Sequence, residues 1–266
     1  MKFGIVGCGG RMGRLLMKLI LEGGGHAIAG GTEREGSPLI GQDLGTLAGC
    51  APIGIAAQAD ARAAFADADA LIDFTTPATA RATARLAAET GTPAVIGTTG
   101  LSPEDLAEIR ACAAKAAILQ SFNMSLGVNL LAALVKNAAA ALPAEAFDIE
   151  IVEMHHKHKV DAPSGTAILL GEAAAEGRSV ALAEVTQSGR HGHTGERRMG
   201  DIGFAALRGG DVVGEHTVIL AGAGERIELT HRATARSIFA TGGLRAAAWL
   251  AGKKPGLYAM TDVLGM

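Results

Sequence analysis

The sequence is short of aromatic residues and carries no large excess of charge of either sign. Phe, Trp and Tyr make up 3% of its 266 residues, and the formal net charge is −3. Proteins that bind nucleic acid generally present a basic face, or aromatic side chains on which bases stack. Because the sequence offers neither feature, we expect no nucleic-acid partner.

Long apolar runs and paired cysteines are also missing. No apolar run approaches the roughly 20 residues that a membrane-spanning helix needs, and the chain enters a predicted strand directly, with no signal peptide before it. The three cysteines, Cys8, Cys50 and Cys112, are widely spaced and odd in number. That usage is typical of free thiols in a reducing compartment. We therefore expect a cytoplasmic protein that does not contact membranes.

A glycine-rich turn joins the first predicted strand, residues 2–6, to an amphipathic helix. Gly7, Gly10 and Gly13 follow a G-x-x-G-x-x-G spacing, which departs from the common G-x-G-x-x-G because Met12 occupies its last position. Apolar residues then recur at the spacing of one helix face. Glycines in this context allow a tight turn and let a pyrophosphate approach the helix N-terminus. The pattern predicts a dinucleotide-binding unit.

The second predicted strand, residues 26–31, is followed by Thr32, Glu33 and Arg34. Glu33 lies about twenty residues beyond the glycine turn, where an acidic side chain typically accepts the ribose hydroxyls of the cofactor. Arg34 could instead neutralise a 2′-phosphate. An acid beside an arginine therefore favours a site that tolerates both NADH and NADPH.

Strand and helix patterns continue to alternate, with strands predicted at residues 70–74, 93–96 and 118–120. Ser102, Pro103 and Asp105 have the chemistry of a helix start. Repeated units of this kind predict a Rossmann-like, doubly wound parallel sheet. Ligands bind beyond the carboxyl ends of such strands, so the segments 97–99 and 121–124 are candidate cofactor contacts.

The pattern changes after Gly127. A helix to about residue 141 precedes an alternating, half-buried strand at 147–154, and hairpin-type turns separate the runs 202–207, 215–220 and 226–231. These features predict a second α+β domain on a largely antiparallel or mixed sheet. We expect an α/β protein with a dinucleotide-binding domain (1–126), a substrate-binding and tetramerisation domain (127–238), and a C-terminal segment (239–266) that packs back on the first.

Residues 153–167 combine proton donors, cations and a helix start, and nothing in the stretch is predicted to be core. His155, His156 and His158 alternate with Lys157 and Lys159. Ser164 is a natural N-cap, and the first N–H groups of the helix after it, at Gly165 and Thr166, are suited to a carboxylate or phosphate. The stretch predicts an active site for a small anion that undergoes proton transfer.

Two other interpretations of this stretch compete. A charge-rich run is often only a solvated loop, and three histidines can bind a metal ion. However, Lys157 and Lys159 put positive charge where a cation would sit. We therefore expect no metal.

These motifs together resemble the 4-hydroxy-tetrahydrodipicolinate reductase (dihydrodipicolinate reductase) family nearly from end to end. The resemblance rests on residues 6–13 (VGCGGRMG), 73–77 (DFTTP), 97–100 (GTTG), Asn123 with Ser125, 155–167 (HHKHKVDAPSGTA), 214–218 (GEHTV), 224–232 (GERIELTHR) and 256–265. It implies a homotetramer that reduces a cyclic dicarboxylate with NADH or NADPH, in lysine biosynthesis through diaminopimelate. Met124 departs from the family, which often has phenylalanine there.

The resemblance also implies roles for individual residues. His155 and Lys159 match the proton donors, and His156, Gly165 and Thr166 match the substrate contacts. The cofactor contacts correspond to Gly7, Cys8, Gly9, Gly10, Arg11, Met12, Glu33, Arg34, Gly97, Thr98, Thr99, Ser121, Phe122, Asn123 and Met124. A histidine-rich loop at residues 190–193 has no role in this scheme.

Two further functions remain open from the sequence. Another NAD(P)-dependent dehydrogenase would leave the paired histidines, the lysine and the Ser-Gly-Thr group without a dianionic partner. A dinucleotide-sensing regulator would need no lysine close to a helix N-terminus. Cofactor oxidation, assayed with and without the cyclic substrate, separates all three functions.

Overall fold

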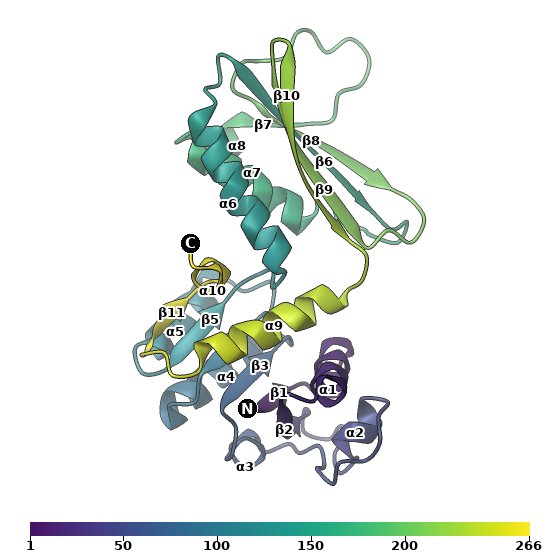
Figure 1. Ribbon diagram of the computed structural model, residues 1–266, viewed down its shortest axis with the longest axis vertical. Coiled ribbons are helices and arrows are strands. Elements are labelled where there is room, and N and C mark those ends of the chain that lie inside the picture. Colours follow the sequence, from purple (N-terminus) through teal and green to yellow (C-terminus); the bar gives the residue numbers. More distant parts are fainter. The chain divides into compact units, whose positions relative to one another are not determined.

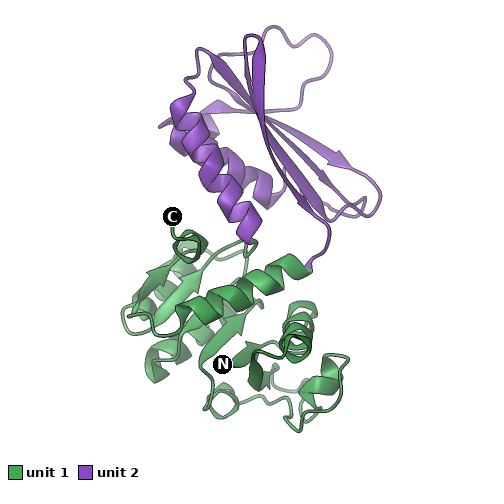
Figure 2. Ribbon diagram, in the orientation of Figure 1, with its two compact units in different colours: residues 1–125, 237–266 green, residues 126–236 purple.

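A computed structural model describes residues 1–266 as two compact units. Unit 1 combines Met1–Ser125 with Ser237–Met266, and unit 2 is Leu126–Arg236 (Figure 2). Each unit has its own sheet and its own buried core. None of the helices is both long and apolar enough to cross a bilayer.

Unit 1 is built on a six-stranded sheet in the order β11-β5-β4-β3-β1-β2 (Figure 1). Every neighbouring pair of strands is parallel, which confirms the predicted doubly wound sheet. The sixth strand, β11, was not predicted. The strands are β1 (Lys2–Val6), β2 (Ala27–Thr32), β3 (Ala70–Asp73), β4 (Ala94–Ile96), β5 (Ala117–Gln120) and β11 (Gly256–Tyr258).

Helices cover both faces of this sheet. Leu71 faces a core that includes alanines of α4 and Ile109 of α5. Ile72 points the other way, where α9 approaches so closely that a Cβ on Gly243 would touch Phe74 and Ile72. The helices are α1 (Arg11–Gly23), α2 (Leu44–Leu47), α3 (Ala61–Ala64), α4 (Pro77–Thr90), α5 (Pro103–Ala113), α9 (Ser237–Leu250) and α10 (Met260–Leu264).

Unit 2 is built on a five-stranded mixed sheet in the order β10-β9-β6-β8-β7. The central strand β6 is antiparallel to β9 and parallel to β8. Apolar side chains of β6, such as Ile149 and Ile151, alternate onto one face and form the core with the helices. The elements are α6 (Leu126–Ala141), β6 (Phe147–His155), α7 (Gly165–Gly177), α8 (Leu182–Val185), β7 (Thr186–Ser188), β8 (Ile202–Arg208), β9 (Gly214–Gly222) and β10 (Glu225–Ala233).

The hairpin predicted between residues 202–207 and 215–220 is wrong, because β6 lies between β8 and β9. The turn that joins β8 to β9 passes the end of β6 instead. The Gly209 N–H donates to the His155 carbonyl (2.9 Å), and the Lys157 N–H donates to the Gly210 carbonyl (3.2 Å). A short glycine turn therefore indicates only that the chain reverses direction. Burial of the apolar β6 decides which strands pair. The hairpin between β9 and β10 is confirmed.

The second face of this sheet has no helix of unit 2 packed on it. Val152 and Met154 of β6 alternate with the core residues and therefore point to this face, beside Ala205 and Leu207 of β8.

Two arginines of the loop before β8 hold Glu150 on the same face: Arg190 donates through two nitrogens at 2.9 Å, and Arg197 donates through Nε at 3.0 Å. This gives the loop of residues 190–193 a structural role through Arg190, although His191 and His193 stay exposed.

Candidate active site

The glycine turn after β1 depends on glycine at two positions. Gly7 has a φ of 68°, a left-handed conformation that favours glycine. A Cβ on Gly13 would collide with the carbonyl oxygen of Gly7 and the backbone of Cys8, so α1 can approach β1 only with glycine there. Gly10 is the N-cap of α1 and supplies no side-chain cap. These features fit the turn of a dinucleotide site, in which the helix N-terminus faces a pyrophosphate.

Glu33 lies against the same turn. Its Oε1 accepts a hydrogen bond from the Gly9 N–H at 2.7 Å, while the neighbouring Arg34 is exposed. Both residues line a pocket at the carboxyl ends of β1, β2 and β3. The lining residues are Val6, Gly7, Thr32, Glu33, Arg34, Ala59, Ala61, Phe65, Thr75, Thr76, Thr79, Ala82, Thr83 and Leu86. The size and polarity of this set fit the adenosine end of a dinucleotide.

The other predicted cofactor residues follow β4 and β5, at the same edge of the sheet. Thr99 and Phe122 are exposed there, and the Ser121 hydroxyl donates to the Asn123 carbonyl at 2.9 Å. Cys8, Thr98 and Met124 are different, because all three side chains are buried in unit 1. The Cys8 N–H donates to the Thr32 carbonyl (2.9 Å).

A buried carboxylate that the sequence analysis did not single out lies beneath these loops. Asp73, at the end of β3, is fully buried. Its Oδ1 accepts from the Thr75 N–H (2.8 Å), the Thr75 hydroxyl (2.6 Å) and the Thr98 hydroxyl (3.0 Å), and its Oδ2 accepts from the Thr83 hydroxyl (2.6 Å). Burial raises the pKa of Asp73, against the effect of these hydrogen bonds. Asp73 thereby ties the loop after β3 to the loop after β4.

In unit 2, β6 ends in a second buried carboxylate, Glu153, beside His155. The His155 Nδ1 lies 2.6 Å from the Glu153 Oε2. Arg208 of β8 donates to both oxygens of Glu153, at 2.8 and 2.9 Å. Burial alone would raise the pKa of Glu153, but the bonds from Arg208, His155 and the Ser164 N–H outweigh burial and hold that pKa below its usual range. Glu153 is therefore an ionised carboxylate.

The prediction that residues 153–167 contribute nothing to the core is wrong for four of them. Ala167 is fully buried in the hydrophobic core of unit 2, and three polar residues are buried as well. Glu153, His155 and Ser164 are 1%, 9% and 2% exposed. Their burial is possible because they satisfy one another: the Ser164 N–H donates to the Glu153 Oε1 at 3.0 Å. The Ser164 Oγ accepts from the Ala167 N–H at 3.2 Å and caps α7, as predicted.

His216 of β9 completes this buried group. Its Nε2 lies 2.9 Å from the Ser164 Oγ, and its ring packs edge-on against His155, with centroids 5.1 Å apart. Burial, followed by the charge of His155, lowers the pKa of His216 to about 4. A neutral His216 beside His155 adds no competing positive charge to the site.

Lys159 and His156 are both half-buried on the loop that follows β6. The Lys159 ammonium pairs with Asp161 at 2.8 Å. The His156 Nε2 lies 3.2 Å from a guanidinium nitrogen of Arg236. Burial, followed by the charge of Arg236, lowers the pKa of His156. The loop therefore presents a lysine and a histidine next to α7, whose first residue, Gly165, is exposed.

Sequence reasoning included Glu153 in the predicted stretch but gave no role to it, to Arg208 or to His216. The alternation of β6 does place Glu153 on the same face as Ile149 and Ile151, and that signal could have revealed a buried acid. Arg208 and His216 lie 55 and 52 residues from their partners in the sequence. Only the strand order brings them to the end of β6.

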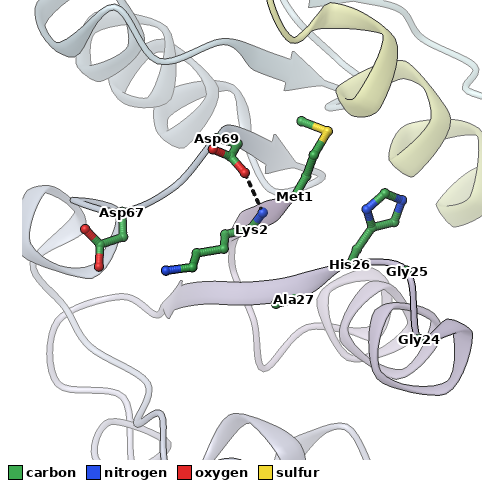
Figure 3. A pocket seen from close by; sticks show the side chains of 8 residues that line it. All are labelled: Met1, Lys2, Gly24, Gly25, His26, Ala27, Asp67 and Asp69. Atoms are coloured by element: carbon green, nitrogen blue, oxygen red, sulfur yellow. Dashed lines mark hydrogen bonds between the residues drawn. The ribbon is translucent and has the colours of Figure 1, made fainter.

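Unit 1 also has a separate hollow (Figure 3). It is lined by Met1, Lys2, Gly24, Gly25, His26, Ala27, Asp67 and Asp69. The Lys2 N–H donates to the Asp69 Oδ2 there at 2.7 Å. These residues precede or begin β1, β2 and β3, whereas Gly7, Glu33 and Asp73 are at or beyond the ends of those strands. The hollow is therefore at the wrong end of the sheet for a dinucleotide.

The fold and these two groups of residues define a class: an oxidoreductase with a Rossmann-like unit for a nicotinamide cofactor and a second unit rich in proton donors. No group of three or more His, Cys, Asp or Glu side chains is arranged to hold a metal ion. Comparison with known proteins identifies the family within this class.

The family described as "Dihydrodipicolinate reductase, N-terminus" matches residues 1–124, and the one described as "Dihydrodipicolinate reductase, C-terminus" matches residues 127–264. The chain belongs to the dihydrodipicolinate reductase family. A curated relative from Parvibaculum lavamentivorans, named 4-hydroxy-tetrahydrodipicolinate reductase, is 60% identical over 266 residues, 100% of this chain and 98% of the relative. Another with that name, from Brucella abortus, is 56% identical over 262 residues, 98% of each.

Solved structures share the fold. The dipicolinate-bound dihydrodipicolinate reductase from Paenisporosarcina sp. TG-14 has a TM-score of 0.76 at 23% identity, covering 97% of each chain. A probable dehydrogenase from Thermotoga maritima has a TM-score of 0.63 at 11% identity, covering 99% of this chain and 92% of the other. These likenesses concern architecture. The family match confirms the predicted oxidoreductase. It supports neither of the two alternatives, another NAD(P)-dependent dehydrogenase or a dinucleotide-sensing regulator.

Proposed function

We propose that this chain reduces (2S,4S)-4-hydroxy-2,3,4,5-tetrahydrodipicolinate to (S)-2,3,4,5-tetrahydrodipicolinate, in lysine biosynthesis through diaminopimelate. The reaction consumes NAD(P)H and one proton and releases water and NAD(P)⁺. The observation that carries the proposal is the end-to-end match to relatives with this name, at up to 60% identity across the whole chain. The arrangement at the end of β6 gives that match a chemical basis.

Unit 1 has residues that fit the cofactor. The turn from Gly7 to Met12 takes the pyrophosphate, Glu33 accepts ribose hydroxyls, and the segments 97–99 and 121–124 lie at the same edge of the sheet. When bound, the nicotinamide supplies a hydride from its C4. The three buried side chains, Cys8, Thr98 and Met124, support this site from beneath.

Unit 2 supplies the proton and holds the dianionic substrate. His155, oriented by Glu153, and Lys159, half-buried on the loop after β6, are the two proton donors. His156 and the N-terminal residues of α7, Gly165 and Thr166, bind a substrate carboxylate, because a helix N-terminus and cationic side chains both favour an anion. The proton neutralises the negative charge that reaches the ring nitrogen as hydride adds.

Glu33 and Arg34 are compatible with either nucleotide. Glu33 suits the free ribose hydroxyls of NADH, and the exposed Arg34 suits the 2′-phosphate of NADPH. We infer that the enzyme accepts both.

The chain is also proposed to form a cytoplasmic homotetramer through unit 2. The face of the sheet opposite α6 and α7 carries Val152, Met154 and Leu207, and Leu207 is 50% exposed. An apolar sheet face of this kind is generally covered by a partner. Light scattering at micromolar concentration should give four times the chain mass of 26.9 kDa. A monomeric mass would refute this assembly.

The reaction itself is tested by cofactor oxidation. Absorbance at 340 nm should fall only when the cyclic substrate is present, with NADH and with NADPH, and pyridine-2,6-dicarboxylate should inhibit in competition with the substrate. If neither cofactor is consumed in the presence of substrate, the proposed function is wrong.

A further inference from the structure

Glu153 accepts four hydrogen bonds from three separate elements of unit 2. Its Oε2 accepts from the His155 Nδ1 (2.6 Å) and the Arg208 Nη1 (2.8 Å). Its Oε1 accepts from the Ser164 N–H (3.0 Å) and the Arg208 Nη2 (2.9 Å). Each oxygen thus accepts one bond from Arg208 and one from a part of the candidate active site. A carboxylate is acceptor-only, so it can satisfy all four donors at once.

We propose that Glu153 and Arg208 are positioning residues, which fix the ring of His155 and the N-terminus of α7 relative to each other. The inference rests on the proposed function and deepens it, since His155 is there a proton donor and α7 binds a substrate carboxylate. Neither Glu153 nor Arg208 acts on the substrate directly.

The orientation of His155 follows from the carboxylate. With Glu153 ionised, Nδ1 must carry a hydrogen and donate it to the Oε2, as in other functional histidines whose second ring nitrogen bonds a carboxylate. The Nε2 is then the ring nitrogen that exchanges a proton. A Cβ on Gly214 would lie 2.9 Å from this Nε2. Gly214 therefore leaves room on that side of the ring.

Arg208 is suited to this position because its planar fork matches both carboxylate oxygens. Its Nη2 also donates to the Asp161 carbonyl at 2.7 Å, and the Asp161 side chain pairs with Lys159. One guanidinium therefore holds Glu153 and the loop that carries the second proton donor. A lysine would keep the charge at residue 208 but could not make these bonds together.

Replacing Glu153 by glutamine should change the tautomer of His155. An amide NH₂ at the Oε1 position would face two fixed donors, the Ser164 N–H and Arg208. At the Oε2 position it would face Arg208 and His155, and His155 can become an acceptor by moving its hydrogen to Nε2. The second arrangement has one donor–donor conflict instead of two. The Glu153→Gln variant should therefore hold His155 with a bare Nδ1 and a hydrogen on Nε2.

Neutron diffraction from deuterated crystals at pH 8.5 tests this without any substrate. We expect a deuteron on the His155 Nδ1 in the wild type and none on that nitrogen in Glu153→Gln. A deuteron on Nδ1 in both proteins overturns the inference. Because this measurement needs no turnover, it decides the role of Glu153 even if the proposed reaction is wrong.

Steady-state kinetics supply the second measurement. Glu153→Gln should lower kcat roughly 10- to 100-fold, as expected for loss of a carboxylate that orients a functional histidine, with the KM for NADH unchanged. The matched control is Glu150→Gln, the same change three residues earlier on β6, which breaks the pair with Arg190 on the opposite face. Glu150→Gln should keep kcat within twofold. Equal losses in both variants, or no loss in Glu153→Gln, contradict the inference.

Arg208→Lys keeps the inference testable if Glu153→Gln does not fold. It preserves the positive charge and loses the fork, so we expect kcat to fall about 3- to 10-fold, less than in Glu153→Gln. Wild-type kcat in Arg208→Lys overturns the role of Arg208. Circular dichroism and the mass in solution, measured for each variant, separate lost positioning from lost folding or assembly.

Discussion

Asp73 of unit 1 and Glu153 of unit 2 are both buried carboxylates at the ends of strands, but different groups hold them. Asp73 accepts only neutral donors: three threonine hydroxyls and one N–H. Glu153 accepts from a guanidinium, an imidazole and an N–H. Burial raises the pKa of Asp73, whereas the donors around Glu153 outweigh burial and lower its pKa.

The difference matches what each unit is proposed to bind. Around Asp73, neutral hydroxyls order the loops for a dinucleotide, and no cation is held beneath them. Around Glu153, a permanent positive charge keeps a carboxylate ionised so that it can orient an imidazole. The hydroxyls around Asp73 organise two loops but leave its pKa raised, whereas the donors around Glu153, Arg208 foremost, hold its pKa below the usual range.

Of the two isosteric changes Glu153→Gln and Asp73→Asn, Glu153→Gln should lower the free energy of unfolding more. It leaves the half-buried Arg208 facing an amide hydrogen, and breaking a buried pair in this way costs about 3 kcal/mol. Urea unfolding followed by circular dichroism at pH 7 measures the change. A loss below about 1 kcal/mol would mean that the pair with Arg208 is not what holds Glu153 ionised.

Arg34→Ala tests the exposed cation beside the pocket of unit 1. Losing one charge-assisted contact should cost about 1.5–3 kcal/mol, roughly ten- to a hundredfold in affinity. The KM for NADPH should rise by that factor, and the KM for NADH should change far less. An equal rise in the KM for both cofactors would mean that Arg34 does not bind the 2′-phosphate.

Asp73→Asn should change stability by less than about 1 kcal/mol at pH 7. The asparagine oxygen can keep the bonds from Thr75 and Thr98, and the Thr83 hydroxyl can rotate to accept from the new NH₂. Trp249, the single tryptophan of the chain, lies in α9 of unit 1 and reports its unfolding. Asp73→Ala is the control and should lose more, because four donors then lack an acceptor. Similar losses of stability in both variants would contradict the view that neutral donors, which an asparagine can also satisfy, hold residue 73.

The two carboxylates should also respond to acid with opposite sign. For Glu153, with a lowered pKa, the stabilisation is complete above the ordinary value of 4.5 and is lost as pH falls through the folded-state pKa. For Asp73, with a raised pKa, the ionised form destabilises, and this penalty fades as pH falls through the folded-state pKa towards 3.8. Unfolding free energies of wild type, Glu153→Gln and Asp73→Asn from pH 7 to 3.5 measure both effects. If the unfolding free energy changed with pH in the same way in all three proteins, the opposite effects expected of Glu153 and Asp73 would be contradicted.

The same contrast explains what the sequence could predict. The parallel sheet of unit 1 follows from local strand, turn and helix patterns, and Ser102 and Ser164 cap their helices as expected. The pairing of β6 with β8 does not follow, because short turns wrongly indicated a hairpin. Arg208 reaches Glu153 only through that pairing. Asp73 falls within the predicted strand 70–74, but its threonine partners are set by tertiary packing.

The proposed division of labour, with the proton donors in unit 2 and the cofactor in unit 1, is tested most directly by turnover of His155→Ala and Lys159→Ala. Each variant should lower kcat by about 10²–10⁴, the usual range for a positioned acid. NADH binding, measured by fluorescence, should stay within twofold of wild type. His156→Ala should act mainly on the KM for the dicarboxylate, and His158→Ala, at an exposed position of the same run, should leave kcat unchanged. Near-normal turnover in both His155→Ala and Lys159→Ala would contradict the mechanism.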